Sequence, residues 1–274
     1  MTPRNIFLDI DGTLVDYSGN LPESARNALM KAHSLGHRLF VCTGRFYSQI
    51  YGWLIRDIPF DGFITSSGAR VRYHGETIFT RFMGRDMILT LKRVLSPLGV
   101  PIMFHTDSCL VTTENELEEA RRFFERNGLR RDACDALFGN VAFGAAEDLP
   151  DIEKAVYYGA KPFSEMKKLF DGFALDPYSY KHLPSTCGEV TMSGVSKAVG
   201  IGALLDHLGE KPEDAIAVGD GGNDIEMIRF VGTGVAMGNA CDALKREASL
   251  VTSPISENGI YAAFEKLGLV DELS

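Results

Sequence analysis

The sequence contains no apolar run that approaches the roughly 18 to 20 residues needed to cross a bilayer. Its first ten residues, MTPRNIFLDI, carry one arginine and a short apolar segment that leads directly into acidic residues, which is not the pattern of a signal peptide. The five cysteines have no CxxC spacing and the six histidines have no ligand spacing, so a structural zinc site is not expected. An odd, unpatterned set of thiols is typical of a reduced protein, and we expect a cytoplasmic location.

Positive charge is scarce as well. The chain has 28 lysine and arginine residues against 37 aspartate and glutamate residues, and its formal net charge is −9. A protein of this sign is poorly suited to nucleic acids or anionic membranes, so neither is expected as a partner. A small anionic substrate is compatible with this charge, provided that a metal ion or a few cations make a local positive site.

The first 70 residues alternate between strand and helix patterns. Apolar strands are expected at residues 5–10, 37–43 and 61–67. Helices between them predict a parallel sheet that is covered by helices on both faces. The segment RVRYHGETIFT at 70–80 then predicts a hairpin that turns at His74 and Gly75.

Beyond this region the pattern changes and later returns. Between residues 83 and 185 the elements are shorter and mixed, which favours an α+β module with an antiparallel sheet. From residue 186 the parallel pattern is expected to resume, beginning with the strand GEVTM at 188–192. We therefore predict a doubly wound, mostly parallel α/β core domain made of residues 1–82 and 186–274, interrupted by an inserted α+β domain at 83–185. Two domains in series are the alternative.

Two aspartates lie at the end of the first apolar strand, in FLDIDGT. Side chains at positions i and i+2 of a strand point to the same face, roughly 6 to 7 Å apart, so Asp9 and Asp11 would point the same way. Gly12 and Thr13 indicate that the strand ends here. Ligands of open parallel sheets bind at the carboxyl ends of the strands, which would leave both carboxylates at a crevice. Asp-Gly is also a common turn pair, so this stretch alone does not establish a site.

A second acidic turn, in AIAVGDGGND, places Asp220 and Asp224 after another apolar strand. Four carboxylates at two strand ends would repel one another unless a cation lay among them, and oxygen ligands of this kind suit Mg²⁺. The glycines do not make a nucleotide-binding loop. A GxGxxG motif would need glycine where Asp224 stands, and no GxxxxGKS/T motif occurs.

Groups that could bind phosphate lie in two further places. In VCTGR, the hydroxyl of Thr43 and the backbone N–H of Gly44 suit phosphate oxygens, although Thr43 alone is as compatible with a helix N-cap. Lys197 begins an expected helix, where a solvated lysine is the alternative to a ligand. The charge balance favours a functional cation at Lys197, because the acidic groups and an anionic substrate both need one.

Four motifs in this order resemble those of the haloacid dehalogenase-like (HAD) phosphohydrolases: FLDIDGT, VCTGR, the lysine of GVSKAVGIGAL, and VGDGGNDIEM. The insertion after the third strand and the segment SENGI at 256–260 resemble the Cof-type subgroup, which carries a large α+β cap. The resemblance implies a HAD-like, Rossmann-like core with the cap at 83–185. The sequence departs from the subgroup at two positions: Ser67 stands where asparagine is usual, and Ala198 follows the lysine where glycine is common.

The resemblance implies a Mg²⁺-dependent phosphatase that acts on small phosphorylated metabolites, such as sugar or cofactor phosphates. Asp9 would be the nucleophile that accepts the phosphoryl group, and Asp11 would be the general acid and then the general base. The ion would be bound by Asp9, the main-chain carbonyl of Asp11, Asp220 and, through water or only as an orienting group, Asp224. The phosphoryl oxygens would be bound by Thr43, Gly44, Lys197 and Asn223.

Other functions remain as alternatives. A phosphomutase or phosphotransferase would form the same phosphoenzyme and pass the group to another hydroxyl. A signalling module would keep the phosphate on Asp9, although a base at Asp11 would speed its loss. In the inserted domain, His105, Tyr157 and Tyr178 are candidate contacts of the leaving group, with core packing or ordinary surface as the alternative for each.

Overall fold

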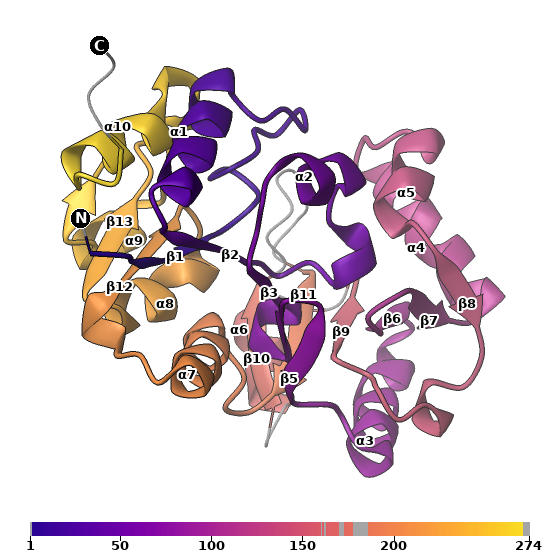
Figure 1. Cartoon of the computed structure of the whole chain (residues 1–274). Helices are drawn as coiled ribbons and strands as arrows, with labels where there is room; N and C mark the ends of the chain where they lie inside the picture. Colours follow the sequence, from indigo (N-terminus) through magenta and orange to yellow (C-terminus); the bar gives the residue numbers. More distant parts are fainter. Residues whose placement is uncertain (1, 160, 162, 170–172, 178–185, 271–274) are drawn as a thin grey trace. The chain divides into compact units, whose positions relative to one another are not determined.

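The computed structural model describes residues 2–159, 161, 163–169, 173–177 and 186–270 (Figure 1). Contacts divide the chain into two compact units. The first unit consists of Met1–Arg45, Ile50–Thr80 and Ser196–Ser274. The second unit consists of Phe46–Gln49 and Arg81–Val195. Each unit contains one sheet, and each is described here by itself.

The sheet of the first unit has eight strands in the order β14-β13-β12-β1-β2-β3-β4-β5. Their bounds are β1 (Asn5–Leu8), β2 (Arg38–Cys42), β3 (Gly62–Thr65), β4 (Arg70–Tyr73), β5 (Glu76–Thr80), β12 (Ala215–Gly219), β13 (Thr233–Ala236) and β14 (Leu250–Val251). All neighbours from β14 to β3 pair in parallel. Every residue of β1 and β12 is buried, which explains why, apart from Asn5, both strands lack polar side chains.

Helices cover both faces of this sheet. They are α1 (Glu23–Ser34), α2 (Gly52–Asp57), α7 (Lys197–Leu208), α8 (Ile225–Phe230), α9 (Asp242–Glu247) and α10 (Gly259–Lys266). The chain leaves β1 through α1 toward β2, and it leaves β12 through α8 toward β13, in the opposite direction along the sheet. Right-handed crossovers therefore place α1 and α8 on opposite faces. Accordingly α1 packs on β2 and α10, whereas α8 packs on β12, β13 and α7 (Figure 1). The predicted doubly wound, mostly parallel α/β fold is confirmed.

The predicted hairpin is also present. Strands β4 and β5 pair antiparallel, and Tyr73 is opposite Glu76 across the turn. The two turn residues, His74 and Gly75, have φ values of 45° and 86°. Two positive φ values in succession are typical of the tight turns whose twist matches that of the adjoining strands.

The second unit contains a six-stranded sheet in the order β10-β11-β9-β6-β7-β8, antiparallel except for the pair β7 and β8. Its strands are β6 (Ile102–His105), β7 (Leu110–Thr112), β8 (Val141–Phe143), β9 (Lys154–Tyr157), β10 (Phe173–Pro177) and β11 (Gly188–Met192). Its helices are α3 (Arg85–Leu95), α4 (Glu114–Arg126), α5 (Arg131–Phe138) and α6 (Phe163–Met166). A capping box of Thr113 and Glu116 begins α4, where it satisfies otherwise unpaired backbone donors.

One expectation about strand pairing is wrong. The strand at 188–192 was expected to resume the parallel sheet, but as β11 it pairs antiparallel with β9 and β10 in the second unit. A short apolar strand has the same pattern in either sheet, because its partners are distant in sequence. The division into a core domain and an inserted domain remains a prediction, and its second boundary is better drawn at Ser196 than at residue 186.

No helix in the described part of the chain combines the length and apolar character that a membrane span requires.

Candidate active site

Three carboxylates meet at the carboxyl ends of β1 and β12. Asp9 directly follows β1, Asp220 directly follows β12, and Asp224 ends the short 3₁₀ helix Gly222–Asp224. One oxygen from each side chain lies within 4.8 Å of the others, and all three residues are buried. The strand order reverses between β1 and β12, and ligands of doubly wound sheets bind at such a point. The side chain of Asp11 is outside this group, and the metal-binding role expected for its carbonyl remains a prediction.

Lys197 lies among these carboxylates. Its Nζ donates to Asp9 Oδ1 at 2.7 Å and to Asp224 Oδ1 at 2.5 Å, and its side chain is completely buried. Burial favours the neutral amine, but the charges of Asp224 and Asp9 outweigh it and raise the pKa of Lys197 above its ordinary value. The alternative of a solvated lysine is therefore wrong.

The first turn of α7 fixes the position of Lys197. The hydroxyl of Ser196 accepts a hydrogen bond from the backbone N–H of Val199 and so caps the helix. Gly68, with a φ of 103°, lets the turn after β3 approach this cap. A Cβ at Gly68 would lie 2.0 Å from the carbonyl oxygen of Ser196, so no other residue fits there without a shift.

The charges of this cluster do not balance. Among the described residues, one ammonium group, that of Lys197, lies with three carboxylates, which leaves an excess of negative charge in a buried place. Burial raises the pKa of Asp9 well above its usual value, against the opposing effect of Lys197. Burial and the charge of Asp224 likewise raise the pKa of Asp220 to about 6. A cluster of hard oxygen donors with unbalanced negative charge fits a divalent cation such as Mg²⁺.

Asp224 is the most constrained of the three carboxylates. One oxygen accepts from Lys197, and the other accepts from the backbone N–H groups of Asp220 and Gly221 at 3.0 and 2.9 Å. Gly219 makes room for it, since a Cβ there would lie 2.6 Å from the Asp224 carboxyl carbon. These contacts favour the orienting role over direct ligation for Asp224, because Asp224 fixes both the lysine and the backbone of the acidic turn.

The expected phosphate-binding residues lie at the same edge of the sheet. Thr43 follows β2 and is buried, and its hydroxyl accepts from the N–H of Arg45 at 3.2 Å within a turn. No helix begins there, so the N-cap alternative for Thr43 is wrong. Gly44 is half-buried, and Asn223 is exposed in the 3₁₀ helix after β12. The roles expected for these residues in binding phosphate remain predictions.

Asp11 has a partner that sequence reasoning missed. Arg45 donates from Nε and Nη2 to the two carboxylate oxygens of Asp11, both at 2.8 Å. Its guanidinium lies over the ring of Tyr51, 4.6 Å from the ring centre. The signal in the sequence was the arginine that completes VCTGR, of which only the threonine and glycine were singled out. Each oxygen of Asp11 accepts one hydrogen bond from Arg45, and the second lone pair of each oxygen is left to carry a proton.

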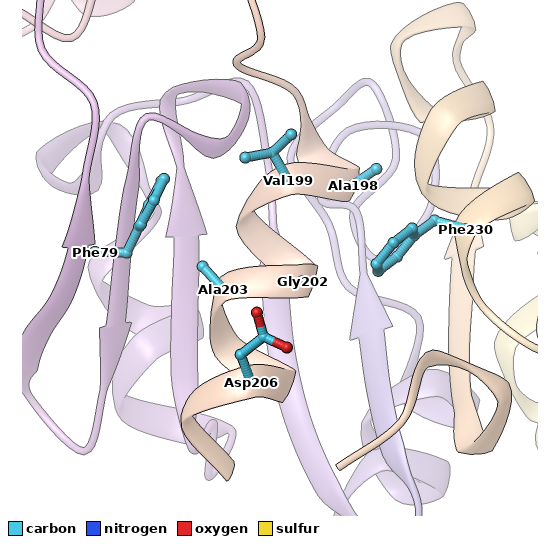
Figure 2. Close-up of a pocket in the computed structure, with 7 residues that line it drawn as sticks. All are labelled: Phe79, Ala198, Val199, Gly202, Ala203, Asp206 and Phe230. Atoms are coloured by element: carbon cyan, nitrogen blue, oxygen red, sulfur yellow. The ribbon is translucent and has the colours of Figure 1, made fainter. Parts of the chain in front are cut away.

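The two departures from the subgroup pattern have separate structural settings. Ser67 has a φ of 58° and follows Ser66 with a φ of 48°, a conformation that asparagine adopts more readily than serine. Ala198 faces a shallow hollow of about 330 Å³ on the exposed side of α7, between Phe79 and Phe230 (Figure 2). None of the residues that line this hollow belongs to the carboxylate cluster.

The candidate leaving-group contacts lie in the second unit or outside the described residues. Tyr157 is fully buried within an apolar cluster, as the packing alternative predicted. His105 is buried with its ring nearly perpendicular to that of Phe46, and burial lowers its pKa well below the usual value. Tyr178 lies outside the described residues.

A family model described as haloacid dehalogenase-like hydrolase matches residues 6–264. The chain belongs to this family. Among curated proteins, this HAD-like hydrolase is 30% identical to YkrA of Bacillus subtilis over 277 residues, which cover 98% of this chain and 100% of that one. It is 27% identical to 5-amino-6-(5-phospho-D-ribitylamino)uracil phosphatase YitU of Bacillus subtilis over 266 residues, or 94% and 95% of the two chains.

Solved structures give the same result. The HAD subclass IIB sugar phosphatase superposes on this chain with a TM-score of 0.82 at 27% identity, covering 97% of this chain and 100% of the other. The resemblance stated from the four motifs is therefore confirmed, and so is the expectation of a hydrolytic enzyme of the HAD type.

Proposed function

We propose that this HAD-like hydrolase is a Mg²⁺-dependent phosphatase of small phosphorylated metabolites, such as sugar or cofactor phosphates, which acts through an aspartyl phosphate at Asp9. The observation that carries the proposal is the meeting of Asp9, Asp220 and Asp224 within 4.8 Å, with Lys197 bonded to the first and third. This arrangement supports a nucleophile beside a cation site.

In this proposal Asp9, Asp11 and Arg45 have different roles in the reaction. An oxygen of Asp9 attacks phosphorus, and the bond from phosphorus to the alcohol oxygen breaks. Asp11 gives a proton to the departing alcohol and later takes one from the water that attacks the aspartyl phosphate. Arg45 donates to both oxygens of Asp11 and so fixes the orientation of the carboxylate that must carry the proton. Arg45 thereby belongs to the proposed machinery.

The phosphoryl oxygens require positive or hydrogen-bonding groups. The ammonium group of Lys197 has three N–H donors. Two of them donate to Asp9 and Asp224, which leaves the third for a phosphoryl oxygen. Thr43, Gly44 and Asn223, at the ends of β2 and β12, would supply further donors. Mg²⁺, bound by Asp9, Asp220 and the carbonyl of Asp11, would add the charge that phosphoryl transfer requires.

Two relatives support the proposed substrate class. One is described as a sugar phosphatase and another as a phosphatase of a phosphorylated ribitylamino-uracil, and both names refer to small phosphate esters. The cytoplasmic location is part of the proposal, and it is supported by the five cysteines, all of which are free thiols.

The test is release of inorganic phosphate from a panel of phosphorylated metabolites in water. The wild-type protein with Mg²⁺ should release phosphate, EDTA should stop it, and renewed Mg²⁺ should restore it. Asp9→Asn should be inactive, while Asp206→Asn, a matched change on the exposed side of α7, should keep full activity. A strict mutase would release little phosphate, and a signalling module would hold a long-lived phosphoryl group without turnover. Full activity in EDTA or in Asp9→Asn would contradict the proposal.

A further inference from the structure

Tyr17 contacts the acidic cluster although the proposed chemistry gives it no role. Its hydroxyl donates to Asp220 Oδ2 at 3.0 Å. Tyr17 is not a core residue, since 55% of its surface is exposed. A tyrosine hydroxyl, with an ordinary pKa of about 10, is a neutral donor at physiological pH.

A tight turn holds Tyr17 in this position. Asp16 accepts hydrogen bonds from the backbone N–H groups of Ser18 and Asn20 at 2.8 and 2.9 Å, and its own N–H donates to the carbonyl of Asn20. These bonds lower the pKa of Asp16 and so stabilise the turn with the carboxylate charged. Val15, two residues before Tyr17, is fully buried. The hydroxyl is therefore presented by a fixed backbone.

The other partners of Asp220 are longer or weaker. Thr13 Oγ1 donates to Oδ1 at 3.4 Å, and Asn239 Nδ2 approaches Oδ2 at 3.4 Å while making its shorter bond, of 2.8 Å, to the carbonyl of Gly12. A Cβ at Gly12 would lie 2.1 Å from Asp220 Oδ2 and 2.8 Å from the Tyr17 hydroxyl. The backbone at Gly12 thus packs directly against the contact between Tyr17 and Asp220. Among the described residues, this contact is the shortest side-chain hydrogen bond to Asp220.

We propose that Tyr17 is a positioning residue for the divalent cation, which acts by fixing the orientation of the Asp220 carboxylate through its hydroxyl. The inference rests on the proposed function, because that function places the cation at Asp220. An unrestrained carboxylate must lose rotational freedom when it binds a metal, and a donor that has already fixed it removes part of this cost. Groups that orient metal ligands in this way typically change metal affinity by roughly 10- to 100-fold.

The test measures metal binding without turnover. Mn²⁺ is titrated into the substrate-free protein, and the free ion is followed by electron paramagnetic resonance. Tyr17→Phe keeps the ring and removes the donor, and we expect its Kd for Mn²⁺ to rise about tenfold. The melting temperature in EDTA should stay unchanged, because the residue is exposed. Tyr261→Phe is the matched control: this tyrosine donates to Glu265 on α10, and its loss should leave the Kd unchanged.

A second variant separates the hydroxyl from the ring. Tyr17→Leu removes both and should weaken binding as much as Tyr17→Phe does. If only Tyr17→Leu weakens binding, or if Tyr17→Phe binds Mn²⁺ within twofold of wild type or more tightly, the inference is wrong while the proposed function survives. If the wild-type protein does not bind Mn²⁺, or if Asp220→Asn binds it equally well, the metal site at Asp220 is contradicted, and with it the proposed function.

Discussion

Replacement of Lys197 by methionine tests the electrostatics of the cluster most sharply. Methionine has a similar length and no charge, so it removes the ammonium group and leaves the packing of α7 nearly intact. Asp9 and Asp224 then lose hydrogen bonds of 2.7 and 2.5 Å in a place where neither carboxylate reaches water freely. Breaking a buried ion pair by removing one partner costs about 3 to 5 kcal/mol, because it leaves an uncompensated charge. Such a loss is a large share of the roughly 5 to 15 kcal/mol that stabilises a typical protein.

The assay is urea unfolding in EDTA at pH 7, followed by circular dichroism. Lys211→Met is the matched control, since Lys211 is exposed, and it should change the free energy of unfolding by less than about 0.5 kcal/mol. The double variant Lys197→Met with Asp224→Asn should be less destabilised than the sum of the two single changes, because the second change removes one of the orphaned charges. A loss of stability for Lys197→Met no larger than that of the control would mean that the ammonium group does not stabilise the buried carboxylates.

Two further predictions concern pH and the arginine. The pKa of Asp220, about 6, is above its ordinary value of 3.8, so the folded protein holds this proton more tightly than the unfolded chain. The contribution of Asp220 to the free energy of unfolding in EDTA should therefore fall by on the order of 2 kcal/mol as the pH rises from 4 to 7. In chemical unfolding between pH 4 and 7, the free energy of unfolding of Asp220→Asn should lack this pH-dependent contribution. The same pH dependence in wild type and Asp220→Asn would contradict the prediction. Arg45→Met should lower kcat by roughly 10- to 100-fold for an alkyl phosphate, because Asp11 is no longer held, and by less for p-nitrophenyl phosphate, whose leaving group needs little acid. The control is Arg56→Met, at an exposed position of α2, and equal losses for both substrates would show that Asp11 is not the group affected.

The convergence of the main acidic groups could be predicted because it depends on local patterns. Apart from the buried Asn5 at the start of β1, the runs of β1 and β12 contain no polar side chain, which indicates burial on both faces and hence a parallel sheet. The carboxyl ends of parallel strands meet at one edge, so Asp9 and Asp220 had to be near each other once the two strands were neighbours. A functional cation at Lys197 was predicted from the excess of acidic charge rather than from any feature of its own helix, whereas its complete burial was seen only in the structure.

The remaining features depend on contacts between distant segments. Arg45 and Asp11 are 34 residues apart, and Tyr17 and Asp220 are 203 residues apart. Nothing in the local sequence around either aspartate specifies these partners. The misplacement of β11 has the same origin, because the choice of sheet is made by strands that are remote in the chain.

The most direct test of the central claim is to locate the phosphoryl group during turnover. Wild-type protein mixed with Mg²⁺ and a substrate found in the panel is quenched in acid, reduced with borohydride and mapped by peptide mass spectrometry, which converts an aspartyl phosphate to homoserine. We expect homoserine at residue 9 in the enzyme during turnover and none when substrate is omitted. Turnover with residue 9 unmodified, or with the phosphoryl group on another side chain, would contradict it.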